Sequence, residues 1–276
     1  MSARGVRLWR RAAMALCAYA FLAPMFYMLS VSLQAEGHGL GGSWLAAARD
    51  PHWENYPTAL ARMGDWRLLL ANTLLVSVLC VAGQLLTCSL AGYAFARVEF
   101  RGRDLAFALV LATMMVPEQA TAIPRFLLFR TLGLVDTFGP LILPAVLGGS
   151  PFFVFLFRQY FLALGPELGE AARVDGCGHL RAWWSIFLPL ARPMLVTVGL
   201  FTFLATWNDL WTPLIYLTSP EKSTLTLALA SFNRSYNTAV EHMLAASAIV
   251  LAPCLLLYFT LQRLFLRGIV VAASKR

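Results

Sequence analysis

Residues 68–96 read LLLANTLLVSVLCVAGQLLTCSLAGYAFA, a stretch without a charged side chain that is long enough to cross a membrane. A helix needs about 20 mainly apolar residues to span the hydrocarbon core of a bilayer. Five further stretches of this kind occur, so the sequence predicts an all-α membrane protein with six transmembrane helices in a single membrane domain, 12–266. The predicted helices occupy residues 12–33, 68–96, 105–124, 138–164, 193–217 and 243–266.

The composition agrees with a bilayer environment. Of the 276 residues, 59% are hydrophobic and 13% are charged, and the mean hydropathy is +0.67. A soluble domain needs roughly 25% charged residues for its surface. The chain is therefore too apolar for a soluble fold.

Basic residues predict the orientation of the helices, because Lys and Arg are retained on the cytoplasmic side of a membrane. Fifteen of the 22 basic residues lie in segments that the helix pattern places on one side, namely 1–11, 97–104, 158–192 and 263–276. Both ends of the chain are therefore expected in the cytoplasm, with short tails at 1–11 and 267–276. The net charge of +8 thus reflects membrane topology, and no nucleic acid is expected as a partner.

The first apolar stretch follows a basic start, as in a signal peptide, and Ala18-Tyr19-Ala20 is similar to a cleavage site. Only residues 12–17 would precede that cut, which is too short for the hydrophobic region of a signal peptide. The first helix is therefore expected to remain in the chain.

The sequence lacks the motifs of common catalytic and metal sites. Its five cysteines and four histidines show neither disulfide nor metal-ligand spacing. It contains no serine-hydrolase elbow and no GxxxxGK[ST] phosphate loop, and its only lysines are Lys222 and Lys275. The chain is therefore expected to have no catalytic residues and to bind no metal or cofactor, so that any ATP involved is bound by another chain.

Residues 165–192 form a long segment between two predicted membrane helices on the cytoplasmic side. ELGEAARVD at 167–175 is rich in helix formers and follows a proline, and Gly176-Cys177-Gly178 provides flexible backbone for a reversal. HLRAWWSIFL at 179–188 resumes a helical pattern, which Pro189 stops. The sequence therefore predicts a helical hairpin.

Two interpretations of the hairpin differ in what it contacts. An interfacial amphipathic helix would place Trp183 and Trp184 among lipid headgroups. The acidic residues Glu167, Glu170 and Asp175 fit that location poorly, because an anionic leaflet repels them. They favour a protein partner with basic residues.

Several residues of the hairpin stand at fixed offsets, namely Glu170-Ala171-Ala172, Gly176, Ile186 and Leu188-Pro189. Their types and spacing resemble the EAA loop of binding-protein-dependent ABC permeases. Gly169 and Cys177-Gly178 depart from the usual pattern, but they stay small. Further segments resemble the maltose and glycerol-3-phosphate type of carbohydrate permease, in particular the smaller, six-helix partner of a permease pair. These are ENY at 54–56, NT at 72–73, AGYAFAR at 91–97, FRTLGL at 129–134, WND at 207–209 and LTSPEK at 217–222.

The resemblance implies the type I fold of ABC importer permeases, with both termini inside and a cytoplasmic coupling-helix hairpin at 165–192, as a multi-pass protein of the bacterial cytoplasmic (inner) membrane. It implies a second permease subunit, two copies of an ABC ATPase that bind ATP and Mg, and an extracytoplasmic solute-binding protein as partners, besides membrane lipid. The chain would pass a sugar or sugar-like solute into the cytoplasm by alternating access.

The resemblance also implies which residues dock onto the ATPase. They are Glu167, Glu170, Ala171, Ala172, Asp175, Gly176, Ile186, Leu188 and Pro189. Glu170 would supply an anion for a basic residue of the partner, the two alanines would allow close helix approach, and Gly176 would permit the turn. For Ile186, Leu188 and Pro189, packing in the core is an equally good interpretation.

Asp209 is expected within the outer half of the fifth helix, where a charge is costly unless it faces water or a partner. With Asn208 it is a candidate to hydrogen-bond sugar hydroxyls, while Trp207 or Trp211 stacks on the solute. An equally good interpretation places both tryptophans in the outer aromatic belt and lets the two polar residues satisfy backbone groups freed by Pro213.

Glu118, in Pro117-Glu118-Gln119, is a further candidate for the substrate path, although a helix end explains it more simply. The docking loop carries no information on the cargo, so a permease for a non-sugar solute such as a glycerophosphodiester or an amino sugar stays open. A secondary transporter is a more distant alternative. An inverted repeat would favour it, and the sequence does not show one.

Overall fold

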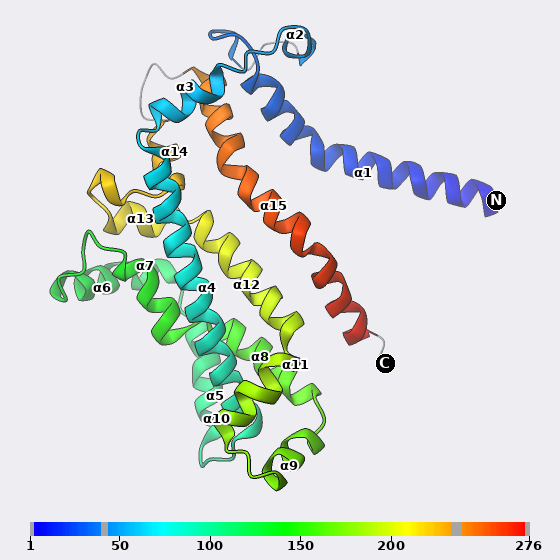
Figure 1. The fold of residues 1–276 in the computed structure, drawn as a ribbon, viewed down its shortest axis with the longest axis vertical. Coiled ribbons are helices and arrows are strands. Elements are labelled where there is room, and N and C mark those ends of the chain that lie inside the picture. The colour runs from blue at the N-terminus through cyan, green and yellow to red at the C-terminus, as the bar shows by residue number, and fades with distance from the viewer. Residues whose placement is uncertain (1–2, 40–43, 233–238, 274–276) are drawn as a thin grey trace. The chain divides into compact units, whose positions relative to one another are not determined.

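The computed structural model describes residues 3–39, 44–232 and 239–273, which contain helices and no strands (Figure 1). The α-helices are α1 Ala3–Ser32, α2 Trp44–Arg49, α3 Asn55–Arg62, α4 Trp66–Arg97, α5 Arg103–Ala112, α6 Glu118–Thr131, α7 Gly139–Leu143, α8 Pro151–Ala163, α9 Glu167–Val174, α10 His179–Ala182, α11 Leu188–Leu190, α12 Arg192–Trp207, α13 Trp211–Tyr216, α14 Leu225–Phe232 and α15 Val240–Ala273. Two 3₁₀-helices, η2 Thr113–Met115 and η5 Pro220–Lys222, and two π-helices, η3 Pro144–Gly148 and η4 Trp183–Phe187, complete the set.

The all-α membrane fold predicted from the sequence is confirmed. Four helices in the described residues are long and apolar enough to cross a membrane, and the number rises to six if each of two bent helix pairs is a single span. The four are Trp9–Ser32, Trp66–Arg97, Gly139–Ala163 and Val240–Thr260. The bent pairs are Arg103–Met115 with Glu118–Thr131, at 99°, and His179–Leu190 with Arg192–Trp207, at 82°.

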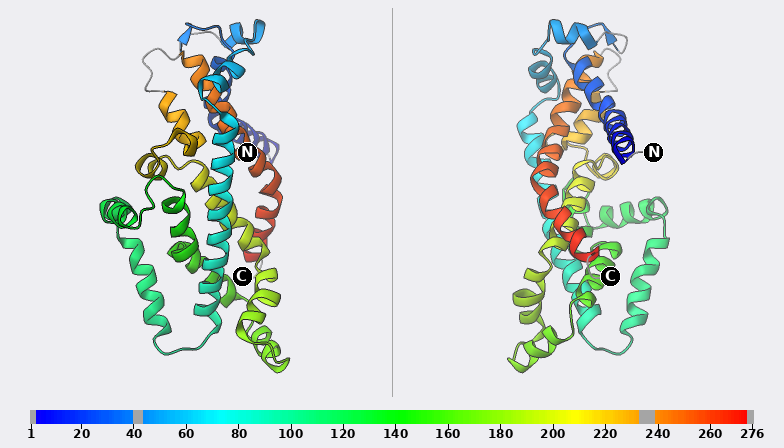
Figure 2. Two further views of the ribbon diagram at one scale, coloured as in Figure 1. Left: turned by 60° about the vertical axis from the view of Figure 1, so that its left-hand side comes forward. Right: turned by 90° about the vertical axis from the view of Figure 1, so that its right-hand side faces the viewer.

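Three of the predicted continuous helices are interrupted. The stretch 138–164 breaks at Gly149, whose φ is 62°, and at the extended Ser150, and proline explains the other two interruptions. The stretch 105–124 bends at Pro117, which is extended at φ −64° and ψ 136° and lies between η2 and α6 (Figure 2). Proline lacks the N–H that a continuing helix needs, so α6 starts afresh in a new direction. The stretch 193–217 likewise divides into α12 and α13, and Pro213 lies in the first turn of α13.

The chain divides into two compact units. The first contains residues 1–66 and 228–254. There the amide of the buried Asn55 donates to the carbonyls of Ser32 and Gln34 at 2.9 and 2.8 Å. Asn55 belongs to the ENY segment, which thereby fixes the start of α3 to the end of α1. Ala59 of α3 packs on the alanines of α15 and is fully buried.

The second unit contains residues 67–227 and 255–276. Its central element is α4, which lies close to α8. A Cβ atom added to Gly92 of α4 would lie 2.5 Å from Cβ of Phe157 of α8, so only glycine allows this approach. Phe157 and Phe161 of α8 are fully buried and stack at 5.9 Å between ring centroids. This aromatic core positions the hairpin.

Candidate functional site

The helical hairpin predicted within 165–192 is present. Its first helix, α9, ends in a left-handed turn at Gly176, whose φ is 73°, a conformation open to glycine without strain. The N–H of Cys177 donates to the Ala172 carbonyl at 2.8 Å, and the N–H of Gly176 donates to the Arg173 carbonyl at 3.0 Å. These two bonds define a Schellman cap, which reverses the chain within a few residues. The second helix, α10, begins at His179.

The predicted docking residues divide between two faces of the hairpin. The outward face carries Glu167, Glu170 and Asp175, which are exposed and form no salt bridge within the described part of the chain. Ala171 and Gly176 are exposed with them. Three exposed carboxylates, two on α9 and one at the turn that follows it, form a surface suited to a basic partner.

The opposite face packs against the membrane helices through Phe187, which is fully buried. Its ring centroid lies 5.1 Å from that of Tyr93 on α4 and 6.0 Å from that of Phe161 on α8. Ala172, 3% exposed, belongs to the same cluster. The hairpin is therefore joined to two long helices at once.

The last three predicted residues connect the hairpin to α12. Ile186 and Leu188 are half-buried and pack against the aromatic cluster, whereas Pro189 is exposed. The helix passes through the π-turn η4 just before Pro189, and it meets α12 at 82° after Ala191. Core packing, the second interpretation given to these residues, describes the contacts of Ile186 and Leu188.

Arg97, at the end of α4, is a residue that the search for docking positions missed. Its guanidinium donates to the carbonyls of Phe161, Leu164 and Gly165 at 2.7, 2.5 and 3.2 Å, and it lies 5.1 Å from the centre of the Phe187 ring. A cation at the end of α8 satisfies carbonyls that the helix leaves unpaired. The only signal for it was the basic residue that closes the AGYAFAR segment.

Exposed apolar side chains on the hairpin were also missed. Val174 is 88% exposed and Leu180 is 69% exposed, on either side of the turn. Val174 lies directly before the exposed Asp175. Helical periodicity did not single them out, because each lies at the end of a short helix.

A cavity of about 210 Å³ lies beside the hairpin. Glu170 lines it together with Arg97, Arg103 and Arg173, and Glu99, which lies outside the hairpin, lines it as well. The carboxylate of Glu170 therefore faces basic residues of its own chain as well as solvent. A positive charge at position 170 would be repelled by them.

The residues proposed for the substrate path do not form one cluster. Trp207 is 1% exposed and stacks on Phe203 at 5.2 Å, so its ring is enclosed by protein, whereas Trp211 is 74% exposed. Asn208 donates to the Leu204 carbonyl at 2.7 Å. Glu118, in the first turn of α6, accepts from Arg125 at 3.2 Å.

Asp209 is the most buried of the three polar path candidates, since Asn208 and Glu118 are exposed. One of its carboxylate oxygens accepts the N–H of Thr212 at 3.2 Å, which caps the start of α13. Backbone contacts of this kind belong to the second interpretation given to Asn208 and Asp209. The side chain of Asp209 also lines a cavity of about 60 Å³ with Thr73, Thr206 and Thr224.

Residues 88–271 match the family described as "Binding-protein-dependent transport system inner membrane component". The chain belongs to this family. It is therefore a membrane-embedded, non-catalytic subunit of a transport system.

Curated relatives of the chain are also permease proteins of transport systems. The chain is 35% identical over 222 residues to the arabinooligosaccharides transport system permease protein AraQ of Halalkalibacterium halodurans, which covers 80% of this chain and 79% of the relative. It is 34% identical over 206 residues to the maltodextrin transport system permease protein MdxG of Bacillus subtilis, which covers 74% of each.

A solved structure has the same fold. It is a bacterial ABC transporter involved in the import of the acidic polysaccharide alginate, and one of its chains matches with a TM-score of 0.80 over 95% of this chain and 98% of that chain. The sequences are 24% identical, so this likeness concerns the fold alone. The permease fold predicted from the sequence is confirmed.

Proposed function

We propose that this chain is the membrane-spanning permease subunit of an ATP-driven importer that moves a sugar or sugar-like solute into the cytoplasm. ATP hydrolysis takes place on two copies of a separate ATPase chain. A second permease subunit and an extracytoplasmic solute-binding protein complete the complex. The observation that carries the proposal is the hairpin, which presents free carboxylates outward and is joined by its inner face to the membrane helices.

The contacts of the hairpin give a route by which the ATPase moves the membrane domain. Glu167, Glu170 and Asp175 bind basic residues of the ATPase, and Val174 and Leu180 pack on its surface. Movement of the ATPase then displaces the hairpin. Packed interiors transmit displacement because they are close to incompressible.

Within the permease, Phe187 and Arg97 carry this displacement onward. Phe187 contacts both α4 and α8, and Arg97 joins the ends of the same two helices. The 82° bend between the hairpin and α12 adds a third helix. The change from an inward-facing to an outward-facing state thus begins as a movement of three helix ends.

The relatives and the polar groups in the helices support a sugar as the cargo. The two permeases compared above are named for arabinooligosaccharides and maltodextrin. Asp209 with Thr206 and Thr224 supplies an acceptor and hydroxyls of the kind that bind sugar hydroxyls, and the exposed Trp211 supplies an aromatic face. Asn208 and Glu118 remain candidates for the same path.

The test uses the complex of both permeases, the ATPase and the binding protein in liposomes. Glu170→Lys and Gly176→Asp are expected to leave the chain in the membrane and to abolish solute uptake driven by ATP. Glu170→Lys reverses a docking charge, and Gly176→Asp forces a β-carbon onto a backbone at φ 73°. Co-purification of the ATPase and uptake of labelled maltodextrin are measured together.

Glu99→Lys is the matched control. It adds the same charge to the same cavity without altering the hairpin, so it is expected to keep ATPase binding. Unimpaired uptake by either hairpin variant, at a normal amount of protein in the membrane, would contradict the proposed docking. Uptake of a glycerophosphodiester in place of any sugar would assign the chain to the non-sugar alternative.

A further inference from the structure

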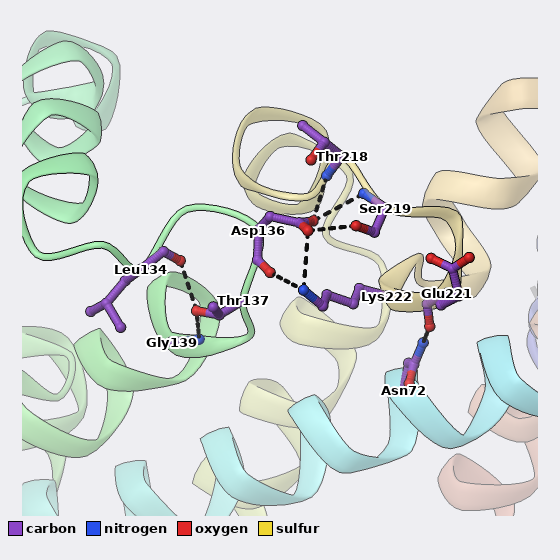
Figure 3. Close-up of polar contacts among 9 residues, drawn as sticks. All are labelled: Asn72, Leu134, Asp136, Thr137, Gly139, Thr218, Ser219, Glu221 and Lys222. Carbon is purple, nitrogen blue, oxygen red and sulfur yellow. Dashed lines mark hydrogen bonds and ion pairs between the residues drawn. The ribbon is translucent and has the colours of Figure 1, made fainter.

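A single carboxylate, that of Asp136, holds the segment that follows α13 (Figure 3). One of its oxygens accepts the backbone N–H groups of Thr218 and Ser219, each at 2.9 Å. The other accepts the Ser219 hydroxyl at 2.5 Å and the Lys222 ammonium at 3.0 Å. The same ammonium donates to the backbone carbonyl of Asp136 at 2.5 Å. We call these four residues the Asp136 clamp.

The backbone at Asp136 is adapted to this role. With φ at 60°, Asp136 is the only non-glycine residue with a positive φ in the described part of the chain. Such a conformation costs free energy and persists where the surroundings hold it in place. Its own N–H donates to the Tyr216 carbonyl at 2.8 Å, which ties it to the last residue of α13.

The segment is fixed from its other side by α4. The side-chain amide of Asn72 donates to the carbonyls of Glu221 and Ser223 at 2.8 and 3.0 Å. The hydroxyl of Thr73 accepts the N–H of Leu225 at 2.9 Å. The residues between α13 and α14 are therefore held between α4 and the loop after α6.

The clamp also connects α13 to α6. The ring of Tyr216 meets Phe129 of α6 edge-on at 5.5 Å and Phe126 at 5.9 Å. At its other end, α13 is capped by Asp209. The short helix that carries Trp211 and follows Asp209 is thus anchored at its start by its own chain and at its end by Asp136.

We infer that Asp136 is a positioning residue for transport, because its carboxylate locks α13 to α6 so that the two helices move as one body when the permease changes conformation. This inference rests on the proposed function. The inference gives a role to the segments FRTLGL and LTSPEK, for which the family resemblance suggested none. Asp136 lies two residues after the first segment, and Lys222 is the last residue of the second.

The chemistry of the clamp requires a carboxylate. Two N–H groups, a hydroxyl and an ammonium all donate toward Asp136, so the acceptor must offer two oxygens and no hydrogen. Asn would turn an N–H₂ group toward donors. Lys222 suits the site because its compact ammonium reaches two oxygens of one residue.

The test measures the clamp in the assembled complex in lipid nanodiscs. Spin labels are placed at exposed positions of α6 and α13, Ile123 and Ile215, with the native cysteines replaced by alanine. We expect a narrow distance distribution between the labels that keeps its width with and without trapped nucleotide. Asp136→Asn is expected to widen it about twofold and to lower uptake about tenfold, since several charge-assisted hydrogen bonds are lost.

Matched variants separate the clamp from a general defect. Thr218→Ala and Glu221→Gln keep the backbone groups that the clamp and Asn72 use, so both are expected to match the wild type. The double variant Asp136→Lys with Lys222→Asp is expected to stay defective, because the N–H groups of Thr218 and Ser219 still need an acceptor. Lys222→Met removes the ammonium but leaves the Asp136 carboxylate with its other three donors. It is therefore expected to widen the distance distribution less than Asp136→Asn.

Wild-type width and uptake in Asp136→Asn would overturn the inference. Recovery in the charge-swapped double variant would reduce the clamp to a simple ion pair and overturn it as well. If Asp136→Asn does not assemble, an unchanged distribution in Lys222→Met has the same consequence. The distances do not depend on import, so a wild-type complex that fails to import sugar would contradict the proposed function and leave the clamp standing.

Discussion

The second unit of the chain is held together differently at the hairpin and at the Asp136 clamp. At the hairpin, buried rings of three elements pack on one another, and one guanidinium spans three carbonyls. At the clamp, one partly exposed carboxylate collects donors from a loop, with only a few rings beside it. Apolar packing has no preferred direction, and it resists displacement of the whole contact. Hydrogen bonds are directional, so they fix one geometry.

The difference suits the two proposed roles. A region that receives force from a partner needs a broad apolar contact, which the aromatic cluster around Phe187 supplies. A region that positions a short helix needs directional bonds, which Asp136 supplies. Substitutions and pH can test whether the hairpin depends on apolar packing and the clamp on directional hydrogen bonds.

The largest effect is expected from Phe187→Ala, which removes the ring at the centre of the hairpin contacts. Truncation of a buried Phe costs about 3–5 kcal/mol. The hairpin should separate from α4 and α8, with faster hydrogen exchange across α9 and α10 and loss of uptake. Trp184→Ala is the control, because Trp184 is 59% exposed and its loss should change exchange little. Equal effects of the two variants would contradict the packing account.

An intermediate effect is expected at Arg97. Arg97→Met leaves three carbonyls without their cation, whereas Arg97→Lys restores a point charge that reaches fewer of them. Because the three bonds share one half-buried guanidinium, their loss is expected to cost about 1.5–3 kcal/mol in total. Thermal unfolding in detergent should rank wild type above Lys and Lys above Met. A Lys variant as stable as the wild type would show that charge alone matters there.

The smallest effect is expected from pH at the clamp. The Ser219 hydroxyl and the N–H groups of Ser219 and Thr218 favour the charged carboxylate, so the pKa of Asp136 lies well below its usual range. Because the folded-state pKa is lowered, the stabilisation is complete above the unfolded-state pKa of about 3.9 and is lost as the pH falls through the folded-state value.

The stability difference between wild type and Asp136→Asn should therefore stay constant from about pH 8 to about pH 5 and shrink only in stronger acid. Unfolding midpoints of the two proteins across that range check this expectation. A difference that already decreases near neutral pH would show that the clamp does not hold the carboxylate charged.

Much of the hairpin was predictable from the sequence, because local features specify it. Gly176 supplies the left-handed turn, Pro189 interrupts the second helix, and the acidic side chains mark the outward face. The residues that hold the hairpin to the membrane helices were harder to find. Arg97 lies about 90 positions before Phe187, and no local pattern relates them.

For the substrate path, the sequence identified a polar residue well but did not distinguish the buried tryptophan from the exposed one. Sequence reasoning found Asp209 because a charge in an apolar stretch is conspicuous. It treated Trp207 and Trp211 as equivalent, whereas one is enclosed and the other exposed. Two residues four apart lie on the same face only while the helix continues, and the break between α12 and α13 separates them.

The sequence by itself determined that this chain is a helical membrane protein with a helical hairpin at 165–192, because length, apolarity and turn residues act locally. The tertiary structure alone decided where helices bend, which of two tryptophans is buried and which donors meet Asp136. Those outcomes depend on side chains about 80 residues apart, such as Asp136 and Ser219. A carboxylate lowers its free energy only where donors converge, and convergence is a property of the folded chain.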